Sequence, residues 1–126
     1  MSLDAIGIVS KDIPKSILFY QLLGIELKGV QGVDHWEGAT PSGVRLMLDS
    51  VALIKEINPD WKESNGSSIV LCFKQKTPKD VDKLYSKIKA SGFKSIKEPW
   101  DAFWGQRYAS VQDPNQNQID LFATLK

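Results

Sequence analysis

A β-α-β-β-β pattern occurs twice along this 126-residue chain, and it limits the fold more than any other feature of the sequence. In the first copy, the β-prone run Leu3–Val9 precedes a helix that Asp12 can cap and Gly24 can end. Strand-like runs then follow at Ile25–Val30, His35–Thr40 and Val44–Leu48. Half a chain of this length, about 60 residues, is too small to bury a core alone, so we expect the two copies to pack as a pair.

The second copy follows a loop that is rich in Asn, Pro, Asp, Ser and Gly, at Asn58–Gly66. After a strand at Ser68–Phe73, Thr77-Pro78 gives a helix start with a capping hydroxyl and a proline at the first helical position. Gly92 ends this helix, and its apolar stripe is formed by Val81, Leu84, Tyr85 and Ile88. The remaining predicted strands begin at Phe93–Ile96 and continue with the hairpin Trp104–Gln112 and Gln118–Leu125.

Composition and charge argue against several classes of function and of site. With 16 Lys and Arg against 15 Asp and Glu, the chain lacks the excess positive charge that a nucleic-acid-binding surface needs. No run of about 20 apolar residues is present to span a membrane, and the start of the chain does not read as a signal peptide, so we expect a cytoplasmic protein. The single cysteine, Cys72, excludes an internal disulfide, and its strand neighbours favour a buried thiol. The single histidine is His35.

The doubled module resembles the vicinal oxygen chelate superfamily, which holds glyoxalase I, extradiol dioxygenases, fosfomycin-resistance transferases and bleomycin-resistance proteins. The residues that carry the resemblance are the opening Ile6-Gly7-Ile8-Val9, then Asp12-Ile13, Phe19-Tyr20 and Gly24, and the closing stretch from Asp113 to Leu121. The expected fold is α+β: two tandem βαβββ modules, about 1–60 and 61–126, form one domain as a curved, half-open mixed β-barrel with its helices outside.

The resemblance also implies where a metal ion would be held. Metal-using members place four ligands on the first, fourth, fifth and eighth strands, and these positions fall on Ala5, Met47, Ser68 and Asp120. Only Asp120 is a strong ligand for a divalent ion, since alanine has no donor, a thioether suits soft metals and a serine hydroxyl is a poor neutral ligand. We therefore expect no metal ion, no other cofactor and no catalytic residue.

An apolar and aromatic wall with a few polar anchors takes the place of the metal. Strand alternation directs one set of side chains into the cavity, and from it we select as ligand-binding candidates Arg45, Met47, Ser68, Trp104, Tyr108, Asp120 and Phe122. The three aromatic residues of this set are expected to stack on a planar ligand, while Arg45 or Asp120 fixes its orientation. Core packing of the aromatics, and ion pairs of Arg45 and Asp120 with each other or with other charges, remain alternatives.

The expected function is metal-independent binding of a small, neutral or weakly anionic aromatic molecule by a homodimer, as in the bleomycin-resistance-like branch. Two alternatives stay open. One is a metal-dependent lyase, isomerase or transferase with ligands elsewhere in the sequence, and the other is a degenerate family member that acts through protein contacts. The sequence leaves undecided whether His35 or Trp36 faces the cavity, and what Trp61 and Trp100 do.

Overall fold

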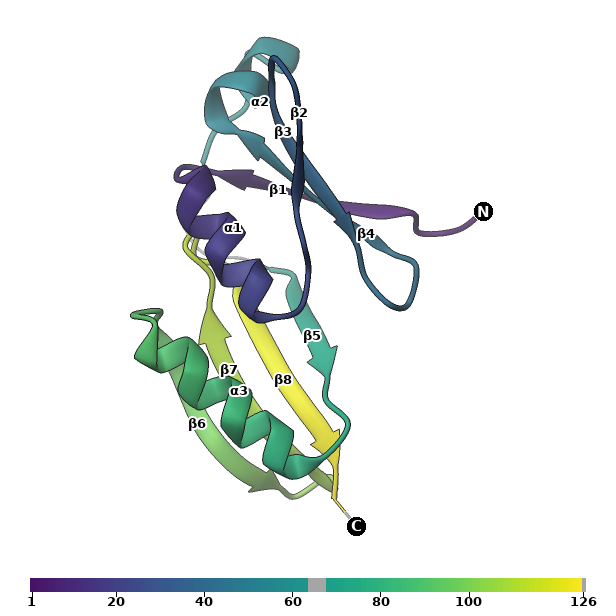
Figure 1. Ribbon diagram of the computed structural model, residues 1–126, viewed down its shortest axis with the longest axis vertical. Coiled ribbons are helices and arrows are strands. Elements are labelled where there is room, and N and C mark those ends of the chain that lie inside the picture. The colour runs from purple at the N-terminus through teal and green to yellow at the C-terminus, as the bar shows by residue number, and fades with distance from the viewer. Residues whose placement is uncertain (64–67, 126) are drawn as a thin grey trace. The chain divides into compact units, whose positions relative to one another are not determined.

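The computed structural model describes residues 1–63 and 68–125 (Figure 1). The chain divides into two compact units, Met1–Ser64 and Asn65–Lys126, each of which holds one four-stranded sheet. The strand order is β1-β4-β3-β2 in the first sheet and β5-β8-β7-β6 in the second. In both sheets the first strand of the unit pairs in parallel with the last, and the other neighbours are antiparallel. The predicted α+β class with two βαβββ modules is confirmed.

In the first unit, helix α1 covers one face of the sheet. Its elements are β1 (Ala5–Ser10), α1 (Ile13–Leu22), β2 (Lys28–Val30), β3 (Val33–Ala39), β4 (Arg45–Ser50) and α2 (Val51–Ile57). The Asp12 carboxylate caps α1 by accepting a hydrogen bond from the amide of Lys15, and Gly24 ends the turn with a φ of 85°. Phe19 and Tyr20 of α1 are fully buried with Leu48 of β4.

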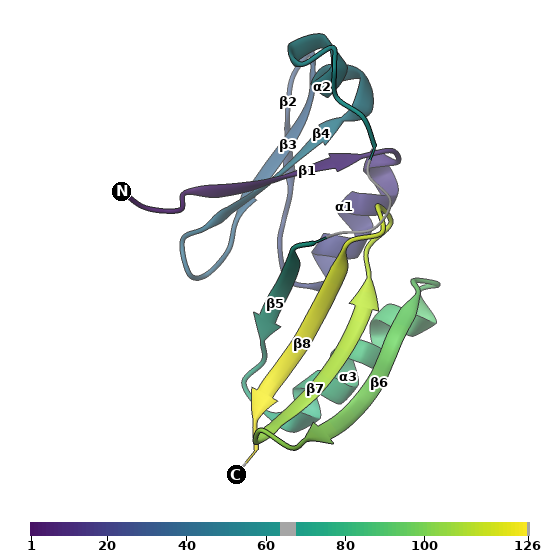
Figure 2. The same cartoon turned by 180° about the vertical axis from the view of Figure 1, so that it is seen from behind.

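In the second unit, helix α3 lies against one face of the sheet, and the strands lie in front of it in Figure 2. The elements are β5 (Val70–Lys74), α3 (Pro78–Ala90), β6 (Ser95–Ala102), β7 (Gln106–Gln112) and β8 (Gln118–Thr124). Thr77 caps α3 as expected, with its hydroxyl accepting from the amide of Asp80. From the helix, Val81 and Ile88 are fully buried, as are Ile119 and Leu121 on the strand side.

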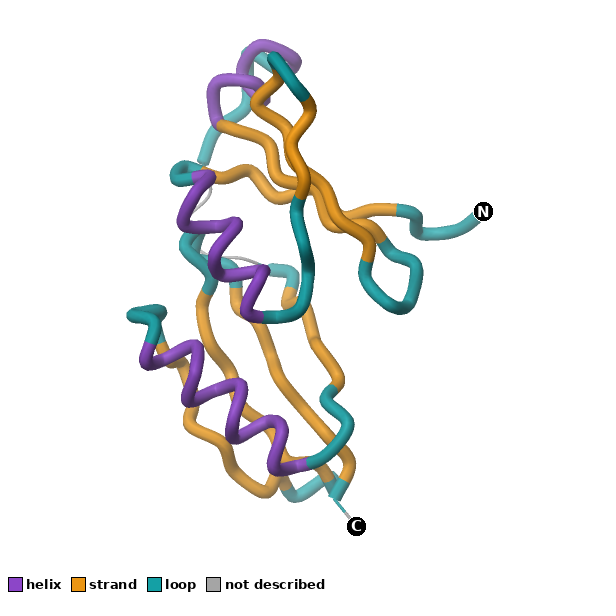
Figure 3. Tube along the Cα trace, viewed as in Figure 1, coloured by secondary structure: helices purple, strands orange, loops and turns teal. Residues whose placement is uncertain are grey.

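The structure differs from the sequence expectation at several strand boundaries and contains one additional helix. Helix α2 was not predicted; it follows β4 without a loop (Figure 3), because Ser50 caps it by accepting from the amide of Leu53. Strand β6 spans Ser95–Ala102, so it begins two residues after the predicted start at Phe93. Strand β7 begins at Gln106, so the prediction that Trp104 lies within it is wrong. The part of the predicted Asn58–Gly66 loop beyond residue 63 lies outside the described residues.

We call the face of each sheet that points away from its main helix, α1 or α3, the open face. On the second sheet, register and alternation place Tyr108, Ser110, Asp120 and Phe122 on the open face, while Ala109, Ile119 and Leu121 are buried on the α3 side. On the first sheet, the open face holds Arg45, Met47 and Asp49 from β4 with His35 and Glu37 from β3. The open face of the first sheet therefore carries mainly charged groups, and that of the second carries polar and aromatic groups.

Candidate ligand-binding site

Five aromatic side chains form a continuous set on the second unit, and we call them the aromatic platform: Trp100, Phe103, Trp104, Tyr108 and Phe122. The ring centroid of Trp104 lies 5.4 Å from that of Trp100, 4.9 Å from that of Phe103 and 5.3 Å from that of Tyr108, all edge-to-face. Tyr108 in turn stacks on Phe122 at 6.1 Å with an interplanar angle of 27°. Trp104 is 47% exposed and Phe103 is 91% exposed, so the platform presents much of its apolar surface.

Asp120 holds the Tyr108 ring of the platform in place through a hydrogen bond. The carboxylate is buried and accepts three hydrogen bonds, from the Tyr108 hydroxyl at 2.7 Å, the Ser110 hydroxyl at 2.7 Å and the Gln118 amide at 2.9 Å. A buried carboxylate needs such donors, because an unpaired charge in the interior is costly. Asp120 therefore fixes the Tyr108 ring in place, and both of its oxygens already accept hydrogen bonds from protein donors.

The Tyr108 phenol stays protonated in this setting. Burial, followed by the hydrogen bond to the negatively charged Asp120, raises the pKa of Tyr108 far above its usual value of 10. The Tyr108 hydroxyl also lies 3.9 Å from the Cys72 sulfur. Cys72 is exposed on the open face, so the expectation of a buried thiol is wrong.

The structure brings together four of the seven predicted ligand-binding residues. Trp104, Tyr108, Asp120 and Phe122 are linked by the ring and hydrogen-bond contacts given above. Trp104 reaches the platform from the turn between β6 and β7, where its indole N–H donates to the Gln106 side chain at 2.8 Å. Ser68 precedes β5 and is exposed, outside these contacts.

Arg45 and Met47 belong to the first unit. Arg45 is held in two ion pairs, to Asp4 and to Glu37, each at 2.8 Å, so the alternative that it pairs with other charges of the protein is confirmed. Met47 lies over Gly7 of β1, where an added Cβ would approach its terminal carbon to 3.6 Å. Their part in ligand binding stays a prediction.

His35, and not Trp36, points to the open face of the first sheet. Its Nδ1 lies 2.5 Å from a carboxylate oxygen of Asp49 and its Nε2 lies 2.8 Å from one of Glu37. Trp36 pairs in register with the buried Leu48 on the helix side and packs so close to Gly29 that no larger residue fits there. The hydrogen bond to Glu37, then that to Asp49, raises the pKa of His35, and the same bond lowers the pKa of Glu37.

The donor set at the positions where relatives hold a metal ion does not fit a divalent ion. Of the four positions that the resemblance assigns to metal ligands, Ala5 has no donor side chain and Ser68 lies exposed before β5. Met47 pairs in register with Gly7 on β1, and Asp120 pairs with Cys72 on β5. The Tyr108 hydroxyl lies within contact of both Cys72 and Asp120, and three donors already occupy the carboxylate. Within residues 1–63 and 68–125, no group of three His, Cys, Asp or Glu side chains could hold a metal ion.

Sequence reasoning missed Trp100 and Lys97 as members of the open face. A proline such as Pro99 usually indicates the end of a strand, but here it lies within β6. This strand is at the edge of the sheet and has two register shifts, so the missing backbone N–H of proline is tolerated there. These shifts place Trp100 in register with Tyr108 and Lys97 in register with Ser110. Pro99 between two β-prone segments was the available signal for such a bulged edge strand.

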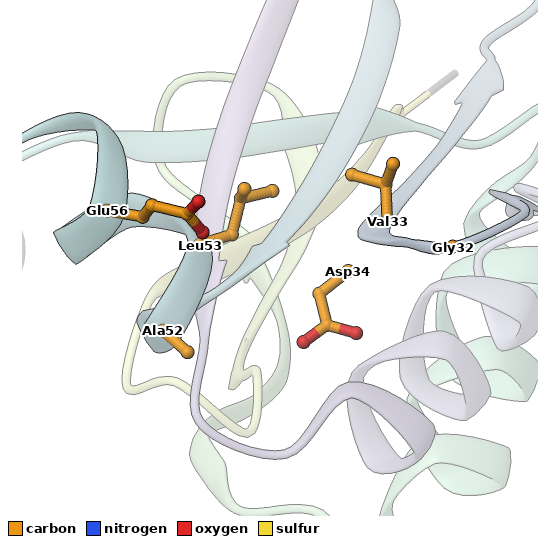
Figure 4. A pocket seen from close by; sticks show the side chains of 6 residues that line it. All are labelled: Gly32, Val33, Asp34, Ala52, Leu53 and Glu56. Carbon is orange, nitrogen blue, oxygen red and sulfur yellow. The ribbon is translucent and has the colours of Figure 1, made fainter.

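A cavity of about 330 Å³ lies elsewhere, in the first unit, between the β2–β3 turn and α2. Figure 4 shows Ala52, Leu53 and Glu56 projecting from α2 across from Val33 and Asp34. None of the predicted ligand-binding residues lines it. Its two carboxylates give it a chemistry different from that of the aromatic platform.

Solved structures share this fold at low sequence identity. A glyoxalase/bleomycin resistance protein/dioxygenase family enzyme from Burkholderia phytofirmans PsJN is 22% identical with a TM-score of 0.88. The match covers 99% of this chain and 100% of that chain. A glyoxalase/bleomycin resistance protein/dioxygenase from Nocardioides is 24% identical with a TM-score of 0.79, covering 100% of this chain and 85% of that one. A glyoxalase-related enzyme from Fulvimarina pelagi is 17% identical with a TM-score of 0.85, covering 98% and 88%. At such identities the likeness shows the fold alone.

No curated protein matches the chain. Among the described residues, none of the helices is long and apolar enough to cross a membrane. The family model of the Glyoxalase/Bleomycin resistance protein/Dioxygenase superfamily, however, matches residues 2–121, which is nearly the whole chain. The duplicated βαβββ topology agrees with that match. The chain therefore belongs to the Glyoxalase/Bleomycin resistance protein/Dioxygenase superfamily.

Proposed function

We propose that this protein binds a small aromatic molecule without a metal ion, on the open face of its second sheet. The observation that carries the proposal is the aromatic platform, in which exposed and half-buried rings follow one another in contact on one side of a sheet. A planar ligand gains both apolar burial and ring stacking on such a surface.

The anchoring of the platform supports binding rather than core packing. Tyr108 is held by Asp120 at 2.7 Å and by its contacts with Trp104 and Phe122, so its ring is fixed before any ligand arrives. A ring that is already ordered loses little entropy on binding, and this favours affinity. The metal-free, bleomycin-resistance-like branch of the family, whose members act as homodimers, offers the nearest functional parallel, and we propose a homodimer here as well.

Tryptophan fluorescence quenching by 2-naphthamide, a neutral aromatic probe, tests the proposal. We expect saturable quenching, and we expect Tyr108→Ala or Trp104→Ala to weaken binding by about 1–3 kcal/mol, the range for an aromatic anchor. Trp61→Ala is the matched control, since Trp61 lies in the first unit and the substitution also removes one indole. Unchanged affinity in both platform variants would contradict the site.

Metal analysis of the purified protein addresses the main rival. A glyoxalase-like lyase, isomerase or transferase would carry stoichiometric zinc, nickel or manganese, whereas the donor chemistry around Asp120 favours none. Stoichiometric metal would overturn the proposal.

A further inference from the structure

Two lysines on the second sheet, Lys74 and Lys97, take part in none of the ion pairs between described residues. Asp120 accepts hydrogen bonds from three protein donors, and Arg107 is turned to the other side of the sheet, where it pairs with Asp82 of α3 and with Asp101. Lys74 lies at one end of the register row that runs through Phe122 and Tyr108 to Trp100. Lys97 lies at the end of the neighbouring row, which runs through Cys72, Asp120 and Ser110.

Lys97 is held beside the platform by a cation–π contact. Its Nζ lies 4.8 Å from the centroid of the Trp100 ring. Among the ion pairs between described residues, none involves Lys97 or its strand neighbour Glu98. An ammonium group has three N–H donors, so a lysine positioned by a ring face can still donate to an acidic oxygen.

The indole N–H of Trp100 is a second, independent observation at the same place. This nitrogen is buried and has no hydrogen-bond acceptor among the described residues. A buried donor without an acceptor is disfavoured, and native proteins rarely leave one unpaired. A free donor and a free cation therefore occur on the same residue pair, at the edge of the aromatic platform.

We propose that the aromatic ligand is an anion such as an aromatic carboxylate, whose charged oxygens are bound by Lys97 and the indole N–H of Trp100 while its ring lies on the platform. This inference rests on the proposed function and names the ligand class for the same site. Arg45 is not needed for the charge, since Asp4 and Glu37 already pair with it. The net charge of +1 places no strong field against an anionic ligand.

A matched pair of probes, 2-naphthoate and 2-naphthamide, separates charge from ring. Calorimetric titration at low salt should give a roughly tenfold lower Kd for 2-naphthoate, and added salt should reduce this difference. In Lys97→Gln, 2-naphthoate should weaken to the level of 2-naphthamide while 2-naphthamide is unaffected. Trp100→Phe, which keeps an aromatic ring and removes the N–H, should weaken 2-naphthoate roughly threefold.

The control is Lys83→Gln on the exposed side of α3, which should change neither Kd. Equal affinity for both probes in the unsubstituted protein, or a preference that persists in Lys97→Gln, overturns the anion assignment and leaves the proposed aromatic site standing. An equal loss for both probes in Lys97→Gln means that the lysine only supports the Trp100 ring, which also overturns the assignment. Failure of both probes to bind overturns the proposed function together with this inference.

Discussion

The two sheets of this protein have the same strand order, but their open faces differ in chemistry. The first carries a chain of charges from Asp4 through Arg45, Glu37 and His35 to Asp49. The second carries stacked rings over a single buried carboxylate. The helix-facing sides, by contrast, are alike, with buried aliphatic residues from the last strand of each unit. Duplication thus preserved the packing side, where volume is constrained, while the open sides acquired different chemistry.

The largest test of this comparison is in the two cores. Leu48→Ala in the first unit and Leu121→Ala in the second each remove a fully buried side chain, and each should lower the free energy of unfolding by about 2–5 kcal/mol. Urea denaturation followed by circular dichroism measures both, with Lys83→Gln as an exposed control. A loss near zero for either one would break the similarity of the two packing sides.

The next effect is expected at Asp120. Asp120→Ala leaves the donors of Tyr108, Ser110 and Gln118 without their acceptor, which should destabilise by about 1–3 kcal/mol. Glu37→Ala is the matched change on the first sheet and should cost less, because the Glu37 side chain is 38% exposed to water. Spectrophotometric titration adds a readout: Asp120→Asn should lower the pKa of the tyrosine that Tyr108→Phe removes. An unshifted pKa would refute the role of Asp120 in holding the phenol.

The smallest effect concerns pH and the first sheet. The carboxylates raise the pKa of His35 above 6.5, so its stabilising contribution is complete below that value and is lost as the pH rises through the folded-state pKa. The pKa of Glu37 is lowered from 4.5, so its contribution is present above 4.5 and is lost as the pH falls through the folded-state value.

Denaturation at a series of pH values checks this expectation. The stability difference between the unsubstituted protein and His35→Gln should be greatest near about pH 6 and should shrink toward about pH 8. On the second sheet, the pKa of Tyr108 is shifted upward from 10, away from this range. A difference that grows with pH would show that His35 is held in its neutral form.

Local signals in the sequence were sufficient for the fold and only partly sufficient for the site. Asp12, Thr77, Gly24 and Gly92 set the ends of two helices through capping and left-handed turns, which depend on neighbouring residues alone. Strand alternation likewise placed Tyr108, Asp120 and Phe122 on one face correctly.

The residues that the sequence did not place are those whose surroundings depend on pairing between distant parts of the chain. The register shifts around Lys97 decide that Trp100 meets Tyr108, and no pattern within β6 encodes its alignment with β7. His35 could be assigned to a face only through its pairing with Asp49, which lies 14 residues further along the chain. Strand alternation led to the expectation that Arg45 orients a ligand. Its ion pairs could not be predicted, because Asp4 and Glu37 come close to Arg45 only in the folded sheet.

The position of the chain's single cysteine gives the protein a built-in reporter. Cys72 is exposed, and its sulfur lies 3.9 Å from the hydroxyl at the centre of the platform. Because thiol-directed reagents act on accessible thiols, alkylation here is selective without any engineered substitution. A molecule seated on Tyr108 would shield the thiol, so the alkylation rate reads out occupancy for compounds that neither absorb nor quench light. Collections of unlabelled compounds can therefore be screened for binding to the unmodified protein by measuring the alkylation rate of Cys72.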